Sequence, residues 1–574
     1  MVIEPGEVIR DWKGVPVSKV SNVPLYLMSG IILLGWFTLD NLAADEQQSN
    51  QQAAADPVAN KSLFTLSRET TRVMGPLRKD GTVDYVAALD AMASRDITVE
   101  NNAAVSLWQI IGPGEILPEH RPEYFKRLGI APLAVQGNYF ITLDQLVQRA
   151  VVGKNVSEKQ FAELDPQVRR NVFAAREKVW EQVGQAQERP WTAREFPLLA
   201  EWLLVNQESF KLLQQASQCR RYYSPLISTE KGLPMVSVLL PGLGQYRELV
   251  RALSIRITMN IGLGKVDEVI ADSVTCHRLG RLVGQGWSLI DSLVGLAMDS
   301  MACQADVIAA HYGKLPPGKI KVWRQQLQGL TPLPSVVERI TIGERFSYLD
   351  SAFGMVRIGP SALDQLAGEA GAEQGAFKNI VFKAWFNTMV DWDDVLRRGN
   401  QWYDELEVAG RKPTYPQRLA AFAKIEQKLV KLGMSTGDPK TLLSSLLARG
   451  KGPRTVLGSF VSDILVTMLL PAVGKATIAE DRLVMNNRLV DVALALAAYR
   501  QETKQYPVQL EQLVPKYLDK IPEDLFVGKP VRYQRKSRGY VLYSVGPNQE
   551  DNKGQRQDAD RDDVGFQIPV PIGQ

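Results

Sequence analysis

The chain has 574 residues and a net charge of +4, with hydrophobic and charged fractions of 45% and 23%. A chain of this length and composition is long enough for several globular domains with ample core. The small basic excess gives no reason to expect nucleic acid as a partner, and no block of Lys and Arg alternates with aromatic residues as single-strand binders need. The 3 His and 3 Cys residues are scattered without the spacing of a zinc site.

An uncharged apolar stretch spans residues 23–39, with the sequence VPLYLMSGIILLGWFTL. A membrane-spanning helix needs roughly 20 apolar residues and at least about 17, so this stretch has the minimum length. Tyr26 and Trp36 stand near its two ends, where aromatic rings favour the membrane interfaces. Basic residues precede the stretch and acidic residues follow it. This bias predicts a single-pass anchor in the inner (cytoplasmic) membrane, with residues 1–22 in the cytoplasm and the body outside.

The same stretch could instead be part of a cleaved signal peptide. Leu42-Ala43-Ala44 offers a small residue at a cleavage point, but the polar segment before the apolar stretch is long for a signal peptide. We therefore favour an uncleaved anchor. Residues 40–60 are rich in Gln, Ala, Asn and Asp and poor in apolar residues, so we predict a flexible tether over 40–65.

Helical periodicity begins soon after the tether. Apolar residues at helical spacing predict helices over 85–92 and 101–111. Residues 157–185 are charged and periodic and are expected to form one long helix. Thr192 and Glu195 have the spacing of a capping box, which predicts the start of the helix that follows.

Helical hairpins are clearest in the middle of the chain, where helices are predicted over 246–263, 266–283 and 289–312 with glycine-containing turns between them. Residues 262–279, GLGKVDEVIADSVTCHRL, resemble one helix-turn-helix unit of a tetratricopeptide repeat. The spacing does not recur at the ~34-residue period of such arrays. Residues 66–480 are therefore predicted to be a body of stacked helical hairpins.

Two later segments also have helical patterns. Residues 391–428 begin with Asp391, Asp393 and Asp394, which could supply carboxylates for acid-base chemistry but are more simply explained as favourable residues at a helix start. Residues 464–473 are apolar but too short to span a bilayer, so we predict a buried helix.

The motifs that could carry chemistry are few. Gly242-Leu243-Gly244 and Gly262-Leu263-Gly264-Lys265 lack the arrangement of a phosphate-binding loop and are interpreted as loop residues. Cys276 and His277 are adjacent, but consecutive helix positions point about 100° apart, so no catalytic dyad is expected there. The cysteines are expected to be buried and unreactive. No motif of a serine hydrolase or a zinc metalloprotease is present.

The C-terminal part changes character. Its first segment has apolar residues at helical spacing and ends before Tyr506-Pro507. A short helix is predicted over 508–518, and alternating residues predict a β-hairpin with strands near 531–533 and at 540–545. An acidic tail follows the hairpin.

Four segments of this region resemble the globular part of type II secretion major pseudopilins: ALAAYRQETKQYP, IPEDLFVGKPVRYQ, YVLYSVGPNQEDN and DADRDDVGF. The resemblance implies an α+β module over residues 481–574, with a helix, a small antiparallel sheet and an acidic loop that binds calcium. No prepilin cleavage motif precedes the helix, so the protein is not expected to form a pilus. The helical body, including the segment RRYYSPL at 220–226, also resembles uncharacterised bacterial envelope proteins.

The resemblance implies calcium as a ligand of the acidic tail, and Asp562-Asp563-Val564-Gly565 match best. Calcium takes six to eight oxygen ligands in flexible geometry, which clustered aspartates can supply. The alternative is an acidic tail that Lys553, Arg556 and Arg561 neutralise without a metal. The predicted ligands are Asp551, Asp558, Asp560, Asp562 and Asp563.

The sequence thus predicts a mostly α protein with a single N-terminal transmembrane helix, a large helical-hairpin body and a small C-terminal α+β module. The predicted function is a membrane-anchored, extracytoplasmic scaffold or binding protein with a protein partner in the cell envelope. The alternative is an envelope hydrolase. A pocket that gathers two carboxylates, or a His and a carboxylate, would favour the enzyme. A groove lined by aromatic and Arg residues would favour the binding protein.

Overall fold

The computed structural model describes residues 63–154, 156–227, 235, 240–359, 386–436, 452–470, 473–555 and 562–570. The predicted anchor at 23–39 and almost all of the tether lie outside the described residues. Within them the protein is mostly helical, with a small antiparallel sheet near the C-terminus. This confirms the predicted balance of secondary structure.

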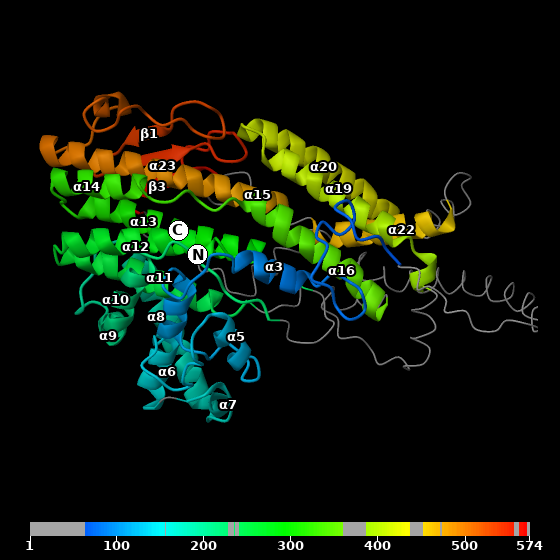
Figure 1. The fold of residues 1–574 in the computed structure, drawn as a ribbon. Helices are drawn as coiled ribbons and strands as arrows, with labels where there is room; N and C mark the ends of the chain where they lie inside the picture. Colours follow the sequence, from blue (N-terminus) through cyan, green and yellow to red (C-terminus); the bar gives the residue numbers. More distant parts are fainter. Residues whose placement is uncertain are drawn as a thin grey trace, which may run out of the picture.

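Four long helices form the centre of the molecule (Figure 1). They are α11 (Leu243–Gly262), α12 (Val266–Val283), α13 (Leu289–Tyr312) and α23 (Val473–Thr503). Helix α13 packs against the other three. The predicted boundaries of the first three helices are correct to within a few residues, because local signals define them. Gly264, for example, adopts φ +70° in the turn between α11 and α12, a conformation that glycine tolerates best.

The N-terminal part of the body consists mostly of short helices, and α5 to α10 lie below α11 to α13 in Figure 1. Two predictions here were wrong. Residues 157–185 do not form one helix, because the chain turns at Asp165, which caps a new helix with Pro166 in its first turn. Thr192 and Glu195 form no capping box, since the next helix starts at Pro197 and Glu195 pairs with Arg189 instead. The helices are α3 (Tyr85–Ala93), α4 (Ala103–Ile111), α5 (Arg121–Arg127), α6 (Leu143–Val152), α7 (Glu158–Ala162), α8 (Pro166–Glu188), α9 (Pro197–Val205) and α10 (Gln207–Ala216).

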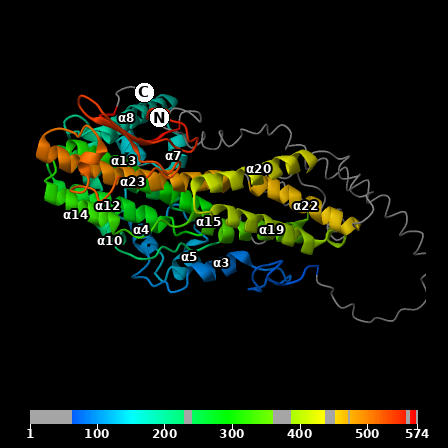
Figure 2. The same cartoon turned by 90° about the horizontal axis from the view of Figure 1, so that it is seen from above.

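A further group of helices extends beyond one end of the central layer (Figure 2). Asp391 caps α19 by accepting a bond from Asp394 N, as the interpretation of the acidic run required. Residues 464–469 are part of a largely buried helix, α22, as predicted. The elements of this group are the π-helical turn η4 (Ile340–Glu344), α16 (Arg345–Ile358), α19 (Trp392–Gly410), α20 (Tyr415–Thr436) and α22 (Pro453–Leu469). The short helix α15 (Val336–Arg339) precedes η4, and α14 (Pro317–Gln328), before it in the chain, packs on α12 and α23.

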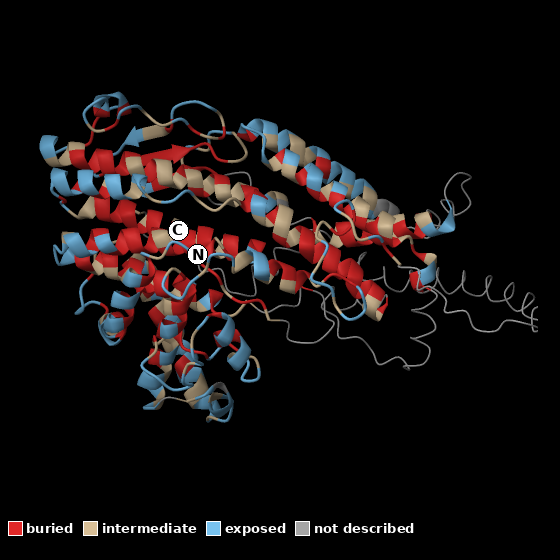
Figure 3. Ribbon diagram, viewed as in Figure 1, coloured by how far each residue is buried: buried red, intermediate tan, exposed pale blue. Residues whose placement is uncertain are grey.

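Two stretches, α13 and Pro453–Thr503, are long and apolar enough to cross a membrane by length and composition. In α13, 67% of the apolar window is buried inside the protein, as in the core helix of a water-soluble domain. Figure 3 shows the central helices as the most buried part of the molecule. The apolar character of α13 is therefore explained by protein packing.

The C-terminal sheet has the order β1 (Arg532–Arg535), β2 (Tyr540–Ser544), β3 (Val564–Ile568). The antiparallel pair β1–β2 confirms the predicted hairpin. Strand β3 was not predicted, and the short helix expected at 508–518 is only a 3₁₀ turn, Leu510–Leu513. All five residues of β2 are buried, because the strand lies in the middle of the sheet and the sheet packs on α23.

Helices α12 and α13 touch backbone to backbone at glycines. A Cβ atom at Gly295 would lie 2.4 Å from Gly280 O and 2.6 Å from Gly284 N. Small residues four apart on one helix allow so close a crossing. The crossing therefore fixes the relative positions of the side chains on α12 and α13, including those of the two sites described below.

Candidate functional site

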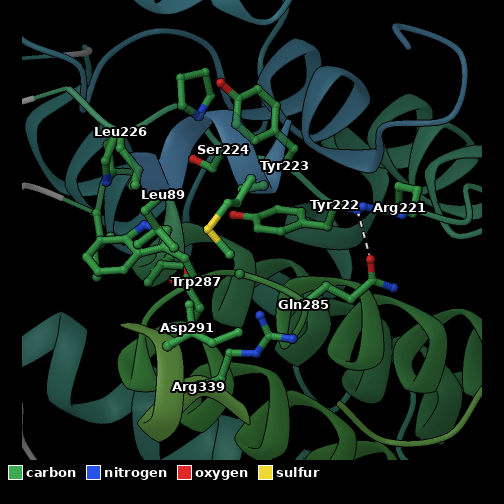
Figure 4. A pocket seen from close by; sticks show the side chains of 18 of the residues that line it. Leu89, Arg221, Tyr222, Tyr223, Ser224, Leu226, Gln285, Trp287, Asp291 and Arg339 are labelled. Carbon is green, nitrogen blue, oxygen red and sulfur yellow. Dashed lines mark hydrogen bonds between the residues drawn. The ribbon is translucent and has the colours of Figure 1, made fainter. Parts of the chain in front are cut away.

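A cavity of about 410 Å³ lies between two hydrophobic cores of the described residues. Its volume is at the lower end of the roughly 300–1,000 Å³ range of ligand pockets. Figure 4 shows the side chains around it. The walls come from α3, the segment 220–226, the start of α11, the turn between α12 and α13, and the α15–η4 region. The lining residues are Leu89, Met92, Ala93, Arg220, Arg221, Tyr222, Tyr223, Ser224, Pro225, Leu226, Leu240, Pro241, Leu243, Gln285, Gly286, Trp287, Asp291, Arg339 and Ile342.

One wall is the segment 220–226, RRYYSPL, which is extended and held by side chains of other elements. Asn102 accepts a bond from Tyr223 N at 2.9 Å and donates one to Tyr223 O at 3.0 Å. Asp90 accepts bonds from Tyr223 Oη and Leu226 N. Gln285 accepts a bond from Tyr222 N at 3.1 Å. The backbone of residues 222–226 is therefore held in place by bonds within the protein, without a ligand.

Asp291 and Arg339 lie side by side across the cavity from Tyr223 and Ser224 (Figure 4). The Asp291 carboxylate accepts bonds from Ser288 N and Oγ at the start of α13. Burial raises the pKa of Asp291 to about 6, although the bonds from Ser288 act in the opposite direction. Burial also lowers the pKa of the Arg339 guanidinium. Its Nε is buried without a hydrogen-bond partner, and its ion pair with Glu338 is 3.7 Å long.

The π-helical turn η4 continues directly from Arg339 and shapes the same wall. Its Gly343 approaches Trp287 so closely that a Cβ atom there would lie 2.2 Å from Trp287 O. Glu344, at the end of the turn, accepts a bond from Leu289 N. Single π-helical turns occur frequently at functional sites. Here the turn brings Arg339 and Ile342 to the cavity while its end holds the start of α13.

A second cluster lies between α12, α13 and α23, and its His277, Asp299, Cys303 and Asp306 are buried. His277 Nδ1 lies 2.7 Å from Asp299 Oδ1, and His277 Nε2 lies 2.9 Å from Asp306 Oδ2. Arg281 Nε donates to the second oxygen of Asp299 at 3.1 Å. Asn487 on α23 donates to Asp299 Oδ1 at 3.4 Å. The Cys303 thiol is 3.9 Å from the same oxygen.

The charges of this cluster balance. Burial alone would lower the pKa of His277, but the carboxylates of Asp299 and Asp306 raise it to about 10. Burial would raise the pKa of Asp299, but His277 and Arg281 lower it below its usual value. Burial raises the pKa of Asp306 more than His277 lowers it. Asp306 Oδ1 is buried and accepts no hydrogen bond from the described residues.

The residues predicted to bind calcium lie in the tail, far along the chain from the cavity. Asp562 and Asp563 accept bonds from Asn548 N and Asn552 N in the loop that follows β2, and Asp551 belongs to that loop. Asp558 and Asp560 lie outside the described residues. Asp563 accepts bonds from Gly554 N at 2.6 Å and Asn552 N at 3.3 Å, and Asp562 pairs with Arg482 at 3.0 Å. These bonds give Asp562 and Asp563 a structural role without a metal ion. The calcium site remains a prediction.

Cys276 and His277 do not form a pair, since both ring nitrogens of His277 contact carboxylates. All three cysteines are free, and burial raises the pKa of Cys276 and Cys303 well above the usual value, so neither is a reactive thiolate. The buried cluster was not predicted from the sequence. A signal was present, because Asp299, Cys303 and Asp306 fall on one face of a largely apolar helix.

No protein-family model matches the chain, and no curated protein or solved structure is significantly similar to it. What the protein does is therefore inferred from its own residues.

Proposed function

We propose that the protein is a binding protein whose cavity receives an apolar segment bearing an acidic group, supplied by a protein partner. The observation that carries the proposal is Arg339: a guanidinium faces a cavity with largely apolar and aromatic walls, and its Nε has no hydrogen-bond partner among the described residues. Unpaired buried polar groups are unfavourable, and an Arg guanidinium forms its strongest hydrogen bonds with carboxylates and phosphates.

The other walls support the apolar part of this ligand. Leu89, Leu226 and Trp287 offer apolar surface, and Met92 is 41% exposed at the cavity. Arg220 and Arg221 are exposed beside them and add positive charge. Aromatic and Arg residues around a concave surface are typical of energetically important parts of protein interfaces.

The proposed location is the cytoplasmic membrane, with the anchor at 23–39 and the body outside the cytoplasm. The support is the charge bias around the anchor and the interfacial positions of Tyr26 and Trp36. The tether would give the body reach, so that the cavity can meet a partner in the envelope.

The experiment uses the full-length chain, solubilised from membranes with its partners. Wild type is compared with Arg339→Gln, with Arg339→Lys, and with the control Arg411→Gln, whose Arg lies on an exposed face paired with Glu407. We expect Arg339→Gln to lower recovery of the partner about ten-fold or more, since bonds to charged groups contribute roughly 1.5–3 kcal/mol. Arg339→Lys should retain part of the binding. Equal recovery with Arg339→Gln and Arg411→Gln would contradict the proposal.

The alternative, an envelope hydrolase, is supported by Asp291, whose raised pKa suits a general acid near neutral pH. Asp291 is the one carboxyl group in the described lining, which has neither a His nor a second carboxylate to act with it. Asp291→Asn separates the two functions. A binding protein keeps its partner in this variant, whereas a hydrolase loses turnover while its substrate still binds.

A further inference from the structure

The cluster around His277 has the composition and arrangement of a metal centre. His277, Asp299 and Cys303 each offer one ligand atom, and these atoms all lie within 4.8 Å of one another. We propose that His277 Nδ1, Asp299 Oδ1 and Cys303 Sγ bind a divalent transition metal ion of the zinc type, at a site separate from the cavity.

The distances suit such an ion. Asp299 Oδ1 is 2.7 Å from His277 Nδ1 and 3.9 Å from Cys303 Sγ. A point between three atoms so spaced lies roughly 2–2.5 Å from each of them, close to the bond lengths of zinc with nitrogen, oxygen and sulfur ligands. Asp299 and Cys303 are four residues apart and so lie on one face of α13. The glycine crossing brings His277 on α12 against that face.

The surroundings complete the arrangement. A metal-binding histidine nearly always donates its other N–H to a carboxylate or carbonyl, and Asp306 is in that place, 2.9 Å from His277 Nε2. The carboxylate that binds the ion is itself usually hydrogen-bonded, and Asp299 accepts bonds from Arg281 and Asn487. Asp306 is thus a positioning residue.

The charge balance is compatible with exchange of protons for the ion. The ion would take the place of the hydrogen in the 2.7 Å contact between His277 Nδ1 and Asp299 Oδ1, and of the thiol hydrogen of Cys303. One divalent ion thus replaces two protons, and the total charge is unchanged. The Nε2 proton stays on His277 and is donated to Asp306. A soft thiolate with imidazole and carboxylate selects a zinc-like ion over calcium or magnesium.

Because the three ligands are almost wholly buried, the ion would be taken up during folding. The full chain is therefore unfolded and refolded with an equimolar amount of Co²⁺ or Zn²⁺, and excess metal is removed. We expect about one ion per chain and an absorption band from thiolate bound to cobalt.

Cys303→Ala should lose the cobalt–thiolate band, whereas Cys276→Ala should keep it. Cys276 is the matched control because it is equally buried, lies beside His277 in sequence and offers its sulfur to no part of the cluster. Asp306→Asn should keep the band but weaken metal binding 10–100-fold. Wild type that refolds without metal, or a band that survives in Cys303→Ala, would overturn the proposal. If Cys303→Ala fails to refold, Cys303→Ser together with the wild-type stoichiometry decides.

Discussion

Gly280 and Gly295 hold α12 and α13 in backbone contact: a Cβ atom at Gly280 would lie 2.7 Å from Gly295 O. The cavity lies on one side of this contact, at the turn from Gln285 to Trp287, and the His277 cluster lies on the other. The two sites therefore depend on the same helix crossing. A displacement of α13 would move Asp291 and Asp299 together.

Gly295→Ala should lower the free energy of unfolding by about 1–3 kcal/mol, because the added methyl group meets backbone atoms that cannot turn aside. Gly184→Ala is the control. Gly184 lies inside α8 with no atom within 4 Å of an added Cβ, so this change should stabilise the protein by about 0.5–1 kcal/mol. Urea unfolding of both variants checks the prediction. A neutral Gly295→Ala would mean that the helices are further apart than described.

Asn102→Ala should destabilise the protein by about 2–4 kcal/mol, because it removes both bonds to Tyr223 and the cap of α4. Asn102→Asp should also destabilise the protein: its carboxylate can accept from Tyr223 N and Ala104 N, but it places a second oxygen against Tyr223 O in a buried position. Partner binding should fall in Asn102→Ala at temperatures where the variant remains folded. Unchanged unfolding would show that the wall at 220–226 does not need Asn102.

Asp291 predicts a specific pH dependence. Its pKa is about 6 in the folded protein and near 3.8 when unfolded, so the folded state binds the proton more tightly. Its burial therefore has no cost below about pH 4, and the cost grows to about 3 kcal/mol as the pH rises through 6. Asp291→Asn does not titrate. The difference in unfolding free energy, variant minus wild type, should increase from pH 4 to pH 7. A constant difference would contradict the raised pKa.

The sequence predicted the elements whose boundaries depend on local signals. It did not predict features that depend on contacts between residues far apart in the chain. Glycine turns define α11 to α13, and Tyr506-Pro507 follows the end of α23 at Thr503. Strand β3 depends on pairing with β2, and no local pattern in the tail required it. Thr192 and Glu195 matched a capping box, but Pro197 and the Arg189–Glu195 pair determined the actual helix start.

For the two sites, too, some residues are noticeable in the sequence, but the contacts that form each site are not. The segment RRYYSPL stood out in the sequence, but its role as a cavity wall depends on Asn102 and Asp90, more than a hundred residues earlier in the chain. In the sequence, the neighbour of His277 that could act with it is Cys276. Its actual partners lie one helix later, at Asp299 and Asp306.

The calcium prediction can be tested on the full chain. Millimolar Ca²⁺ should raise the melting temperature by mass action, and Asp562→Ala combined with Asp563→Ala should abolish the rise. Arg482→Gln should enlarge it, because Asp562 is then free of its ion pair. The rise is compared within each variant, since Asp563 also holds the loop through Gly554 N. No rise in wild type would leave these aspartates with their structural bonds alone.

The most direct measurement of the binding proposal places a photoreactive amino acid at Met92, which lines the cavity, and at Leu77, which does not. The two positions are similarly exposed, at 41% and 48%. After irradiation of intact cells, the partner and the crosslinked peptide are identified by mass spectrometry. We predict a single partner segment at Met92, containing an acidic group beside apolar residues, lost in Arg339→Gln and absent at Leu77. Equal crosslinking at both positions, or a segment at Met92 without an acidic group, would contradict the account.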